Sequence, residues 1–249
     1  MTGVQTCALP ISTLDDKIEL NNKINNELEQ MAKTLYDYWF VQFNFPDEHG
    51  KPYKSSGGKM VYSDELKREI PEGWEVKKIG EVAVVKAGGD KPELFSVVKT
   101  ENYTIPIYSN GINNDGLYGY TNKAIIIEQS VTISARGTIG YCILRNKPFV
   151  PIIRLIVIIP KVTGCVKYFY EYFKNMGFNK SGSVQQQLTV PSVSNLNMLY
   201  PDIDVLKKFG TITFPYINES ELLKEQNQEL AQLRDFLLPL LMNGQVAVK

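Results

Sequence analysis

Histidine and cysteine are scarce in this chain of 249 residues. His49 is the only histidine, and the three cysteines, Cys7, Cys142 and Cys165, are odd in number and far apart. A Ser-His-Asp triad or a histidine-rich metal site therefore has little support, and the cysteines show neither a disulfide framework nor metal-ligand spacing. We expect no metal and no cofactor, and a reducing cytoplasm fits this use of cysteine best.

Long apolar runs and a secretory leader are missing as well. No run approaches the roughly 18 apolar residues that suggest a membrane span, and no basic segment followed by an apolar stretch opens the chain. We therefore expect neither a membrane protein nor a secreted one. Residues 1–12 (MTGVQTCALPIS) lack helical periodicity and differ in character from the rest of the chain, so we treat them as a suspected non-native leader.

The chain has no net charge, but its charges are unevenly distributed. Residues 72–215 contain 16 Lys and Arg against 11 Asp and Glu, a net charge of +5, and the remainder carries −5. A basic middle between acidic flanks is typical of a DNA-contacting module on a protein-contacting frame. A division of this size also arises by chance, so it only supports other signals.

Apolar residues recur every three, four or seven positions near both ends of the chain, which predicts two helices. The segment Glu27–Met31 also matches Glu229–Leu233 at an offset of 202 residues, so the helices share one heptad phase. We expect helices over 13–43 and 216–249 to form an antiparallel coiled coil, with Asn21 as a polar core residue. The alternative is two amphipathic helices packed on one globular core. The residues expected to make the coiled coil or partner contacts are Leu28, Met31, Leu35, Leu230, Leu233 and Leu237.

The middle of the chain is rich in strand signals. Residues 44–70 contain prolines, glycines and aromatics and are predicted to be a linker, whereas 71–215 alternate short β-branched runs with turn signals such as Asn110-Gly111. One amphipathic helix is expected from about Cys165 to Met176. The predicted fold class is α+β, a strand-rich domain flanked by two long helices that form the antiparallel coiled coil. Strands are expected at 82–85, 105–108, 124–128, 131–134, 141–144 and 154–159.

Five short motifs distinguish this sequence from other α+β proteins. They are Pro71-Glu72-Gly73-Trp74 with Ile79-Gly80-Glu81, Ile105–Gly111, Val131–Gly140, Gly182–Leu188 and Leu233–Leu241. In this order they resemble the second half of type I restriction–modification specificity subunits. The resemblance implies a central conserved helix over 13–43, a target-recognition domain over 71–215 and a distal conserved helix over 216–249. The first recognition domain of that family has no counterpart here.

The resemblance implies a reader of DNA that performs no chemistry. Such a subunit recognises one half of a bipartite double-stranded DNA target, docks methyltransferase (M) subunits and, through the complex, a restriction (R) subunit, in DNA methylation and defence against foreign DNA. Two copies of this chain also have the means to associate through their coiled coils. The alternative is a structural or protein-interaction module that works through the coiled coil without reading DNA. An enzyme is disfavoured, because the sequence has neither a methyltransferase motif pair nor a nuclease-like carboxylate cluster.

Candidate DNA contacts fall on four segments. Lys86 and Lys91 flank a glycine-rich loop suited to phosphates, and Arg136 lies at the tip of a hairpin. Amides and an aromatic after a strand, and a polar segment near the end of the domain, are suited to base edges. The ordinary alternatives are surface or hairpin turns for the loop residues and a structural role for the polar segment near the end of the domain. Trp74 and Ile79 are predicted to anchor the core rather than to contact DNA. The remaining candidates are Asn110, Asn113, Asn114 and Tyr118, together with Ser183, Gln185, Gln186 and Gln187.

Overall fold

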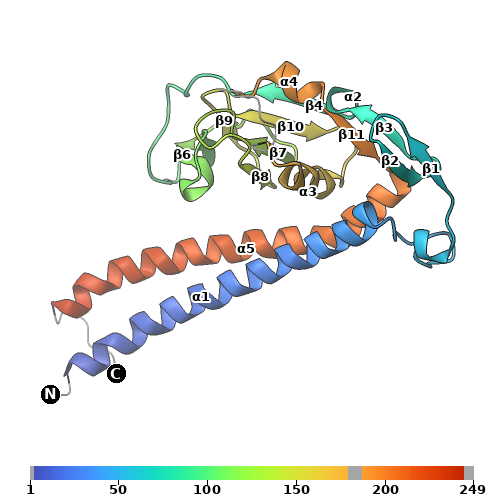
Figure 1. Cartoon of the computed structure of the whole chain (residues 1–249). Helices are drawn as coiled ribbons and strands as arrows, with labels where there is room; N and C mark the ends of the chain where they lie inside the picture. Colours follow the sequence, from blue (N-terminus) through green and yellow to red (C-terminus); the bar gives the residue numbers. More distant parts are fainter. Residues whose placement is uncertain (1–2, 179–186, 244–249) are drawn as a thin grey trace. The chain divides into compact units, whose positions relative to one another are not determined.

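The computed structural model describes residues 3–178 and 187–243 and divides the chain into two compact units (Figure 1). Of the described residues, 3–35 and 214–243 make up the first unit, a helix hairpin, and 36–178 and 187–213 make up the second, a globular unit. The hairpin is formed by α1 (Gly3–Tyr36) and the greater part of α5 (Ile203–Met242). The predicted α+β class, with two long helices around a strand-rich domain, is confirmed.

Side-chain hydrogen bonds fix the direction of the two helices. Asn227 Nδ2 donates to Asn22 Oδ1 at 2.9 Å, and Arg234 forms an ion pair with Asp15, also at 2.9 Å. A later residue of α5 therefore meets an earlier residue of α1, so the predicted antiparallel pairing is confirmed. Arg234 is half-buried and joins the helices through Asp15, and it also forms an ion pair with Asp235 of its own helix.

Least exposed positions recur at alternating steps of three and four along both helices, which is the pattern of a coiled-coil seam. Leu28, Leu35, Leu230 and Leu237 lie on this seam as predicted. Met31 and Leu233 do not lie on the seam, since they are 52% and 45% exposed. The coiled-coil contact predicted for them is therefore wrong, and the alternative role in partner contacts stays a prediction. The seam of α1 instead uses the neighbouring Ala32, which is fully buried, because a small residue lets the helices approach closely. The seam positions are 14, 18, 21, 25, 28, 32 and 35 in α1 and 216, 220, 223, 227, 230, 234, 237 and 241 in α5.

Asn21 is fully buried in the seam, as the sequence predicts. Its Nδ2 donates to Gln226 Oε1 at 2.7 Å and to Asn227 Oδ1 at 2.8 Å, which ties this position of α1 to one position of α5. Its Oδ1 is buried without a hydrogen-bond partner. A buried amide of this kind lowers the stability of a coiled coil and specifies its register.

The Asn21→Leu variant should therefore gain stability and lose register. We expect its free energy of unfolding to rise by about 1 kcal/mol, because an unsatisfied polar group is replaced by an apolar one. Disulfide trapping between cysteines at 15 and 234 checks the register. A pair at 15 and 227, one heptad out of register, should form only in the variant. Asn26→Leu, at an exposed position of α1, is the control and should trap only the 15–234 pair.

Aromatic side chains form the core where α1 ends. The chain continues as a π-helical turn, Asp37–Val41, which buries Trp39 and Phe40. The ring of Phe40 lies 4.6 Å from that of Tyr168 and 5.0 Å from that of Phe209, centroid to centroid. Trp74 and Ile79 are buried, which confirms their predicted role as core anchors. The Phe45 ring stacks on Trp74 at 4.8 Å, so the segment predicted to be a linker packs against the domain.

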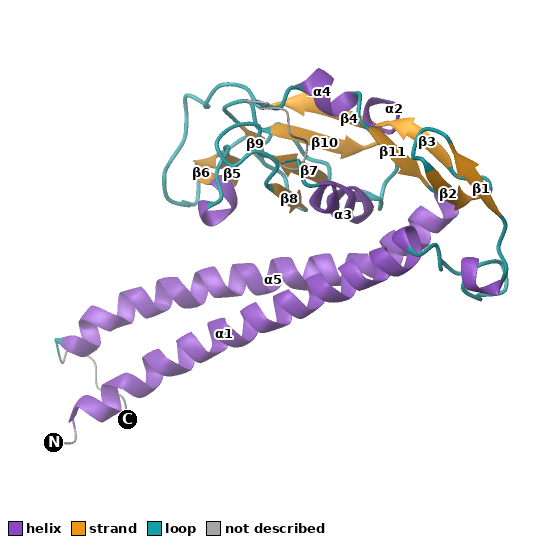
Figure 2. Cartoon of the chain, viewed as in Figure 1, coloured by secondary structure: helices purple, strands orange, loops and turns teal. Residues whose placement is uncertain are grey.

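The central sheet has four antiparallel strands in the order β4-β10-β7-β8, and α3 (Val166–Met176) packs on the last three of them (Figure 2). These strands are β4 (Ala83–Ala87), β10 (Ile156–Pro160), β7 (Ser130–Ile133) and β8 (Cys142–Arg145). A second sheet has the order β6-β5-β9, from β6 (Leu117–Thr121), β5 (Ile105–Tyr108) and β9 (Val150–Pro151). Two-stranded sheets pair β1 (Met60–Ser63) with β2 (Arg68–Pro71) and β3 (Glu75–Lys78) with β11 (Asn197–Tyr200). The short helices are α2 (Ile79–Val82) and α4 (Val190–Ser194).

Four predicted elements need correction. The strand expected at 124–128 is only an isolated bridge between Ile126 and Phe149, and the linker expected at 44–70 contains most of the β1–β2 hairpin. Helix α5 begins at Ile203 and runs through Pro215, where the sequence placed a boundary. Helix α1 likewise begins at Gly3, ahead of the predicted helix start at residue 13.

Candidate nucleic-acid interface

The four strands of the central sheet share an end. Ile156, the first residue of β10, pairs with Ala87 and Ile133, the last residues of β4 and β7, and Ile133 pairs with Cys142, the first residue of β8. The loops 88–91, 134–141 and 152–155 therefore all leave from this end. Together with the loop 109–116 after β5, they form what we call the loop cluster.

Asn110 joins three of these loops. Its Nδ2 donates to the Ile153 carbonyl at 2.5 Å, and its Oδ1 accepts from the Ala135 N–H at 2.7 Å. One carboxamide thus satisfies a backbone acceptor of one loop and a backbone donor of another. Both sides of the side chain are used by the protein, which favours the turn interpretation of Asn110 over base reading.

Buried Arg145 fixes the loop after β5 to the central sheet. Its Nε donates to Thr132 Oγ1 at 3.1 Å and its Nη2 donates to the Asp115 carbonyl at 2.5 Å, while the guanidinium lies 3.5 Å from the centre of the Tyr108 ring. The Tyr141 hydroxyl adds a bond to Asp115 Oδ1 at 3.3 Å. Arg145 therefore stabilises the fold and is not available to bind a ligand.

The loop 152–155 is held in a strained conformation. Ile153 and Arg154 both have positive φ angles, 53° and 62°, a region that β-branched residues rarely adopt. The Ile153 N–H donates to the Gly89 carbonyl at 2.9 Å and the Arg154 N–H to the Gly88 carbonyl at 3.1 Å. Gly88 has to be glycine, because a Cβ there would lie 2.8 Å from the Ile152 nitrogen.

Cationic side chains are exposed on and beside the loop cluster. Lys86 lies one position before the end of β4, and Lys91, Arg136 and Arg154 lie in the loops. The Lys91 ammonium is 4.1 Å from the centre of the Phe95 ring, which holds its position. Neither Arg136 nor Arg154 forms an ion pair with another residue in the ranges 3–178 and 187–243. Exposed ammonium and guanidinium groups of this kind suit phosphates and base edges.

The structure brings together candidates that the sequence placed on separate motifs. Tyr118 lies at the start of β6, beside the loop that carries Lys91, since the rings of Phe95 and Tyr118 are 5.8 Å apart. Leu188, next to the half-buried Gln187, donates its N–H to the Ala135 carbonyl at 3.1 Å. Asn113 and Asn114 are exposed in the loop after β5. The candidates Ser183, Gln185 and Gln186 lie outside the described residues.

One exposed cation of the cluster, Arg154, was not among the predicted contacts. It belongs to an apolar run that is predicted to be one strand from 154 to 159, whereas β10 begins only at Ile156. The turn that exposes it depends on contacts with Gly88, Gly89 and Asn110, which are 43 to 66 residues away in sequence. No local signal in the sequence identifies it.

Groups suited to nucleophilic or metal chemistry are not found in the described part of the cluster. Burial raises the pKa of the Cys142 thiol to about 12 and that of Cys165 to about 11, so both stay protonated at neutral pH. Within the described ranges, no three His, Cys, Asp or Glu side chains are placed to share a metal ion. No helix in these ranges combines the length and apolar character that crossing a bilayer requires.

Known proteins resemble the chain along most of its length. The specificity subunit of the type I restriction enzyme MjaIX from Methanocaldococcus jannaschii is 27% identical over 269 residues, which cover 98% of this chain and 59% of that protein. The HindI specificity subunit from Haemophilus influenzae is 22% identical, and the match covers 95% of this chain and 65% of that protein. The chain therefore spans about three fifths of the length of these relatives.

The fold is shared with a solved structure as well. The crystal structure of a type I restriction–modification S subunit from M. genitalium matches with a TM-score of 0.58 at 18% identity, over 95% of this chain and 58% of that one. The family described as type I restriction modification DNA specificity domain matches residues 71–232, more than half of the chain. The chain thus belongs to the family of type I restriction–modification DNA specificity domains.

Proposed function

We propose that this chain reads one half of a bipartite double-stranded DNA target for a type I restriction–modification complex, through its loop cluster. The observation that carries the proposal is the gathering of Lys86, Lys91 and Arg136 at one end of the central sheet, on loops tied together by Asn110 and Arg145. Lysines and arginines position a protein on the phosphates, and the exposed amide and aromatic groups at 113, 114 and 118 supply chemistry for base edges. The chain itself performs no bond-breaking step in this role.

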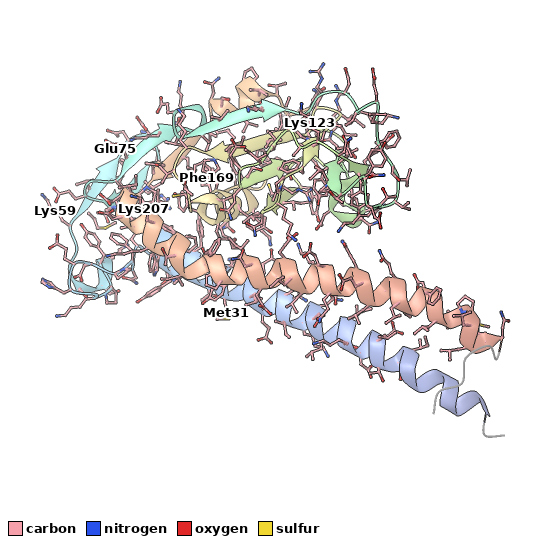
Figure 3. The ribbon with its side chains drawn as sticks, turned by 180° about the vertical axis from the view of Figure 1, so that it is seen from behind. Met31, Lys59, Glu75, Lys123, Phe169 and Lys207 are labelled. Carbon is pink, nitrogen blue, oxygen red and sulfur yellow. The ribbon has the colours of Figure 1, made fainter. Side chains whose placement is uncertain are left out.

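The helix hairpin offers a surface for the subunits that do the chemistry. Three apolar residues each directly precede a seam residue: Ile24 and Met31 of α1 and Leu233 of α5. Such positions lie on one side of an antiparallel helix pair. Leu20 and Phe236, one turn away, extend the same side, and all five are exposed. Met31 projects outward from the helix pair in Figure 3. An exposed apolar strip on a helix pair marks a protein-binding face.

This apolar strip is the docking face that we propose for methyltransferase subunits, with a restriction subunit joining through the assembled complex in the cytoplasm. A second copy of the chain is the other occupant that the strip could take, since the seam itself is filled by α1 and α5 of one chain. Sedimentation of the isolated chain at micromolar concentration separates the two. A monomer favours docking of another subunit, and a dimer that Met31→Glu dissociates favours self-association.

DNA binding through the loop cluster, which the reading of a target requires, is tested by the salt dependence of binding. Fluorescence anisotropy of the full chain with a pool of labelled genomic duplexes should show affinity falling at least about tenfold between 50 and 200 mM salt, because each phosphate contact releases counterions. A chain with Lys86, Lys91 and Arg136 all replaced by alanine should bind much more weakly at low salt. The matched control replaces Lys17, Lys23 and Lys33 of α1, which removes the same charge from the hairpin.

The alternative, a protein-interaction module that does not read DNA, predicts different data. It requires that the two triple variants behave alike and that a partner held by the apolar strip responds little to salt. Equal binding by both variants would reject the loop cluster as the DNA-contacting surface.

A further inference from the structure

We propose that Arg154 contacts DNA, and that Asn110 holds it beside Arg136 as the second arginine of the recognition surface. This inference rests on the proposed function and names a residue that the sequence motifs do not include. It starts from the backbone of the loop 152–155, where two consecutive residues adopt the left-handed region. Strained backbone of this kind persists only where the surroundings hold it, and it concentrates at functional sites.

The strained turn at 152–155 places the Arg154 guanidinium in solvent. Ile152 and Leu155 are buried, whereas the two residues between them are exposed, Ile153 to 49%. The Leu155 N–H closes the turn by donating to the Ile152 carbonyl. Three further hydrogen bonds hold it from outside: from Ile153 to Gly89, from Arg154 to Gly88, and from Asn110 to the Ile153 carbonyl. Because the Ile153 side chain is exposed, its burial does not offset the backbone strain. We attribute the strained conformation to the exposed position that it gives the guanidinium of Arg154.

Asn110 couples the two arginines through one side chain. Its Nδ2 binds the carbonyl of Ile153, which is in the peptide group joined to Arg154, and its Oδ1 binds the N–H of Ala135, the residue before Arg136. The backbone is thus fixed by opposite atoms of the same carboxamide directly before Arg154 and one residue before Arg136. Two guanidinium groups held at a set spacing suit duplex DNA, where arginine binds phosphates or the O6 and N7 atoms of guanine.

The charges around Arg154 leave it available. It forms no ion pair with another residue that the structure describes. The acids of the loop cluster are Asp90 and Asp115, and Asp115 accepts from the Tyr141 hydroxyl through its side chain and from Arg145 through its carbonyl. An exposed arginine of this kind, on a turn held by long-range hydrogen bonds, is arranged to bind an anion rather than to stabilise the fold.

The test compares Arg154→Ala with Lys208→Ala, which removes one exposed cation from α5, in anisotropy with the genomic duplex pool. We expect Arg154→Ala to weaken binding about tenfold or more and Lys208→Ala to change it less than twofold. Arg154→Lys separates two modes of contact: recovery of affinity indicates that the positive charge is enough, as at a phosphate, whereas continued loss indicates a bidentate contact of the guanidinium with a phosphate or a guanine edge. Both outcomes support the contact.

A second pair of variants changes position rather than charge. Gly88→Ala places a Cβ 2.8 Å from the Ile152 nitrogen and should displace the turn, and it should weaken binding like Arg154→Ala. Gly89→Ala, where a Cβ meets nothing within 4 Å, is its control. Wild-type binding by Arg154→Ala, while the Lys86, Lys91 and Arg136 triple variant loses binding, would overturn this inference alone. Unchanged binding in both would overturn the proposed function as well.

Discussion

The Asn110→Ala variant should lose about 1–3 kcal/mol of unfolding free energy and most of its DNA binding. The substitution leaves the N–H of buried Ala135 without its partner, which costs about 1–3 kcal/mol, whereas water can replace the bond to the carbonyl of exposed Ile153 at little cost. Binding falls because the loops that carry Arg136 and Arg154 are no longer tied together. Chemical denaturation and DNA anisotropy of the same preparation measure both effects.

Asn113→Ala is the matched control for this prediction. Asn113 lies three residues further along the same loop and is exposed, so its loss should change the unfolding free energy by less than about 0.5 kcal/mol. Asn110→Asp keeps the acceptor for Ala135 and removes the donor to Ile153, so its stability should lie between those of wild type and Asn110→Ala. Equal stability of Asn110→Ala and Asn113→Ala would show that Asn110 does not hold the loops.

The Gly210→Ala variant should be strongly destabilised, against the usual effect of this substitution. In an exposed helix interior, glycine to alanine gains about 1 kcal/mol. At position 210 of α5, however, the new Cβ would lie 2.1 Å from the carbonyl oxygen of Gly164 and 2.9 Å from its carbon. Gly164 itself has a φ angle of 84° just before α3, so it has little freedom to move aside.

Overpacking of this severity should cost about 3 kcal/mol or more. Thermal unfolding of the full chain followed by circular dichroism measures it, and Lys208→Ala, two residues away and exposed, should unfold near the wild-type temperature. A Gly210→Ala chain that is as stable as wild type would mean that α5 and the Gly164 loop do not pack as closely as described.

Sequence periodicity predicted the elements whose signals are local. The strand Ile105–Tyr108 and the helix Val166–Met176 lie at the predicted positions, because β-branched alternation and an aromatic helix face are encoded within a few residues. The antiparallel hairpin and the buried Asn21 followed from the heptad pattern. The heptad pattern did not predict every seam position. Hydropathy favours Met31 over its neighbour Ala32, whereas the close approach of the two helices favours the smaller Ala32.

The site depended on contacts that no local pattern encodes. The sequence named Lys91, Asn110 and Arg136 on separate segments. Lys91 and Arg136 converge through the shared end of β4, β10, β7 and β8, and Asn110 joins them through its hydrogen bonds to Ile153 and Ala135. Asn110 carried two interpretations, and the choice between them required the positions of Ala135 and Ile153, which are 25 and 43 residues away. Arg154 could not be found at all, since its exposure depends on backbone strain within an apolar run.

The most direct test of DNA reading by the loop cluster is a photo-crosslink from this cluster to DNA. A photoreactive amino acid is placed at Asn113, in the loop after β5, and separately at Tyr62, an exposed position in the β1–β2 hairpin. With the genomic duplex pool at low salt, we predict a covalent adduct from position 113 and none from position 62. An adduct from 62 alone, in a chain that binds DNA, would contradict the assignment of the loop cluster as the reading surface.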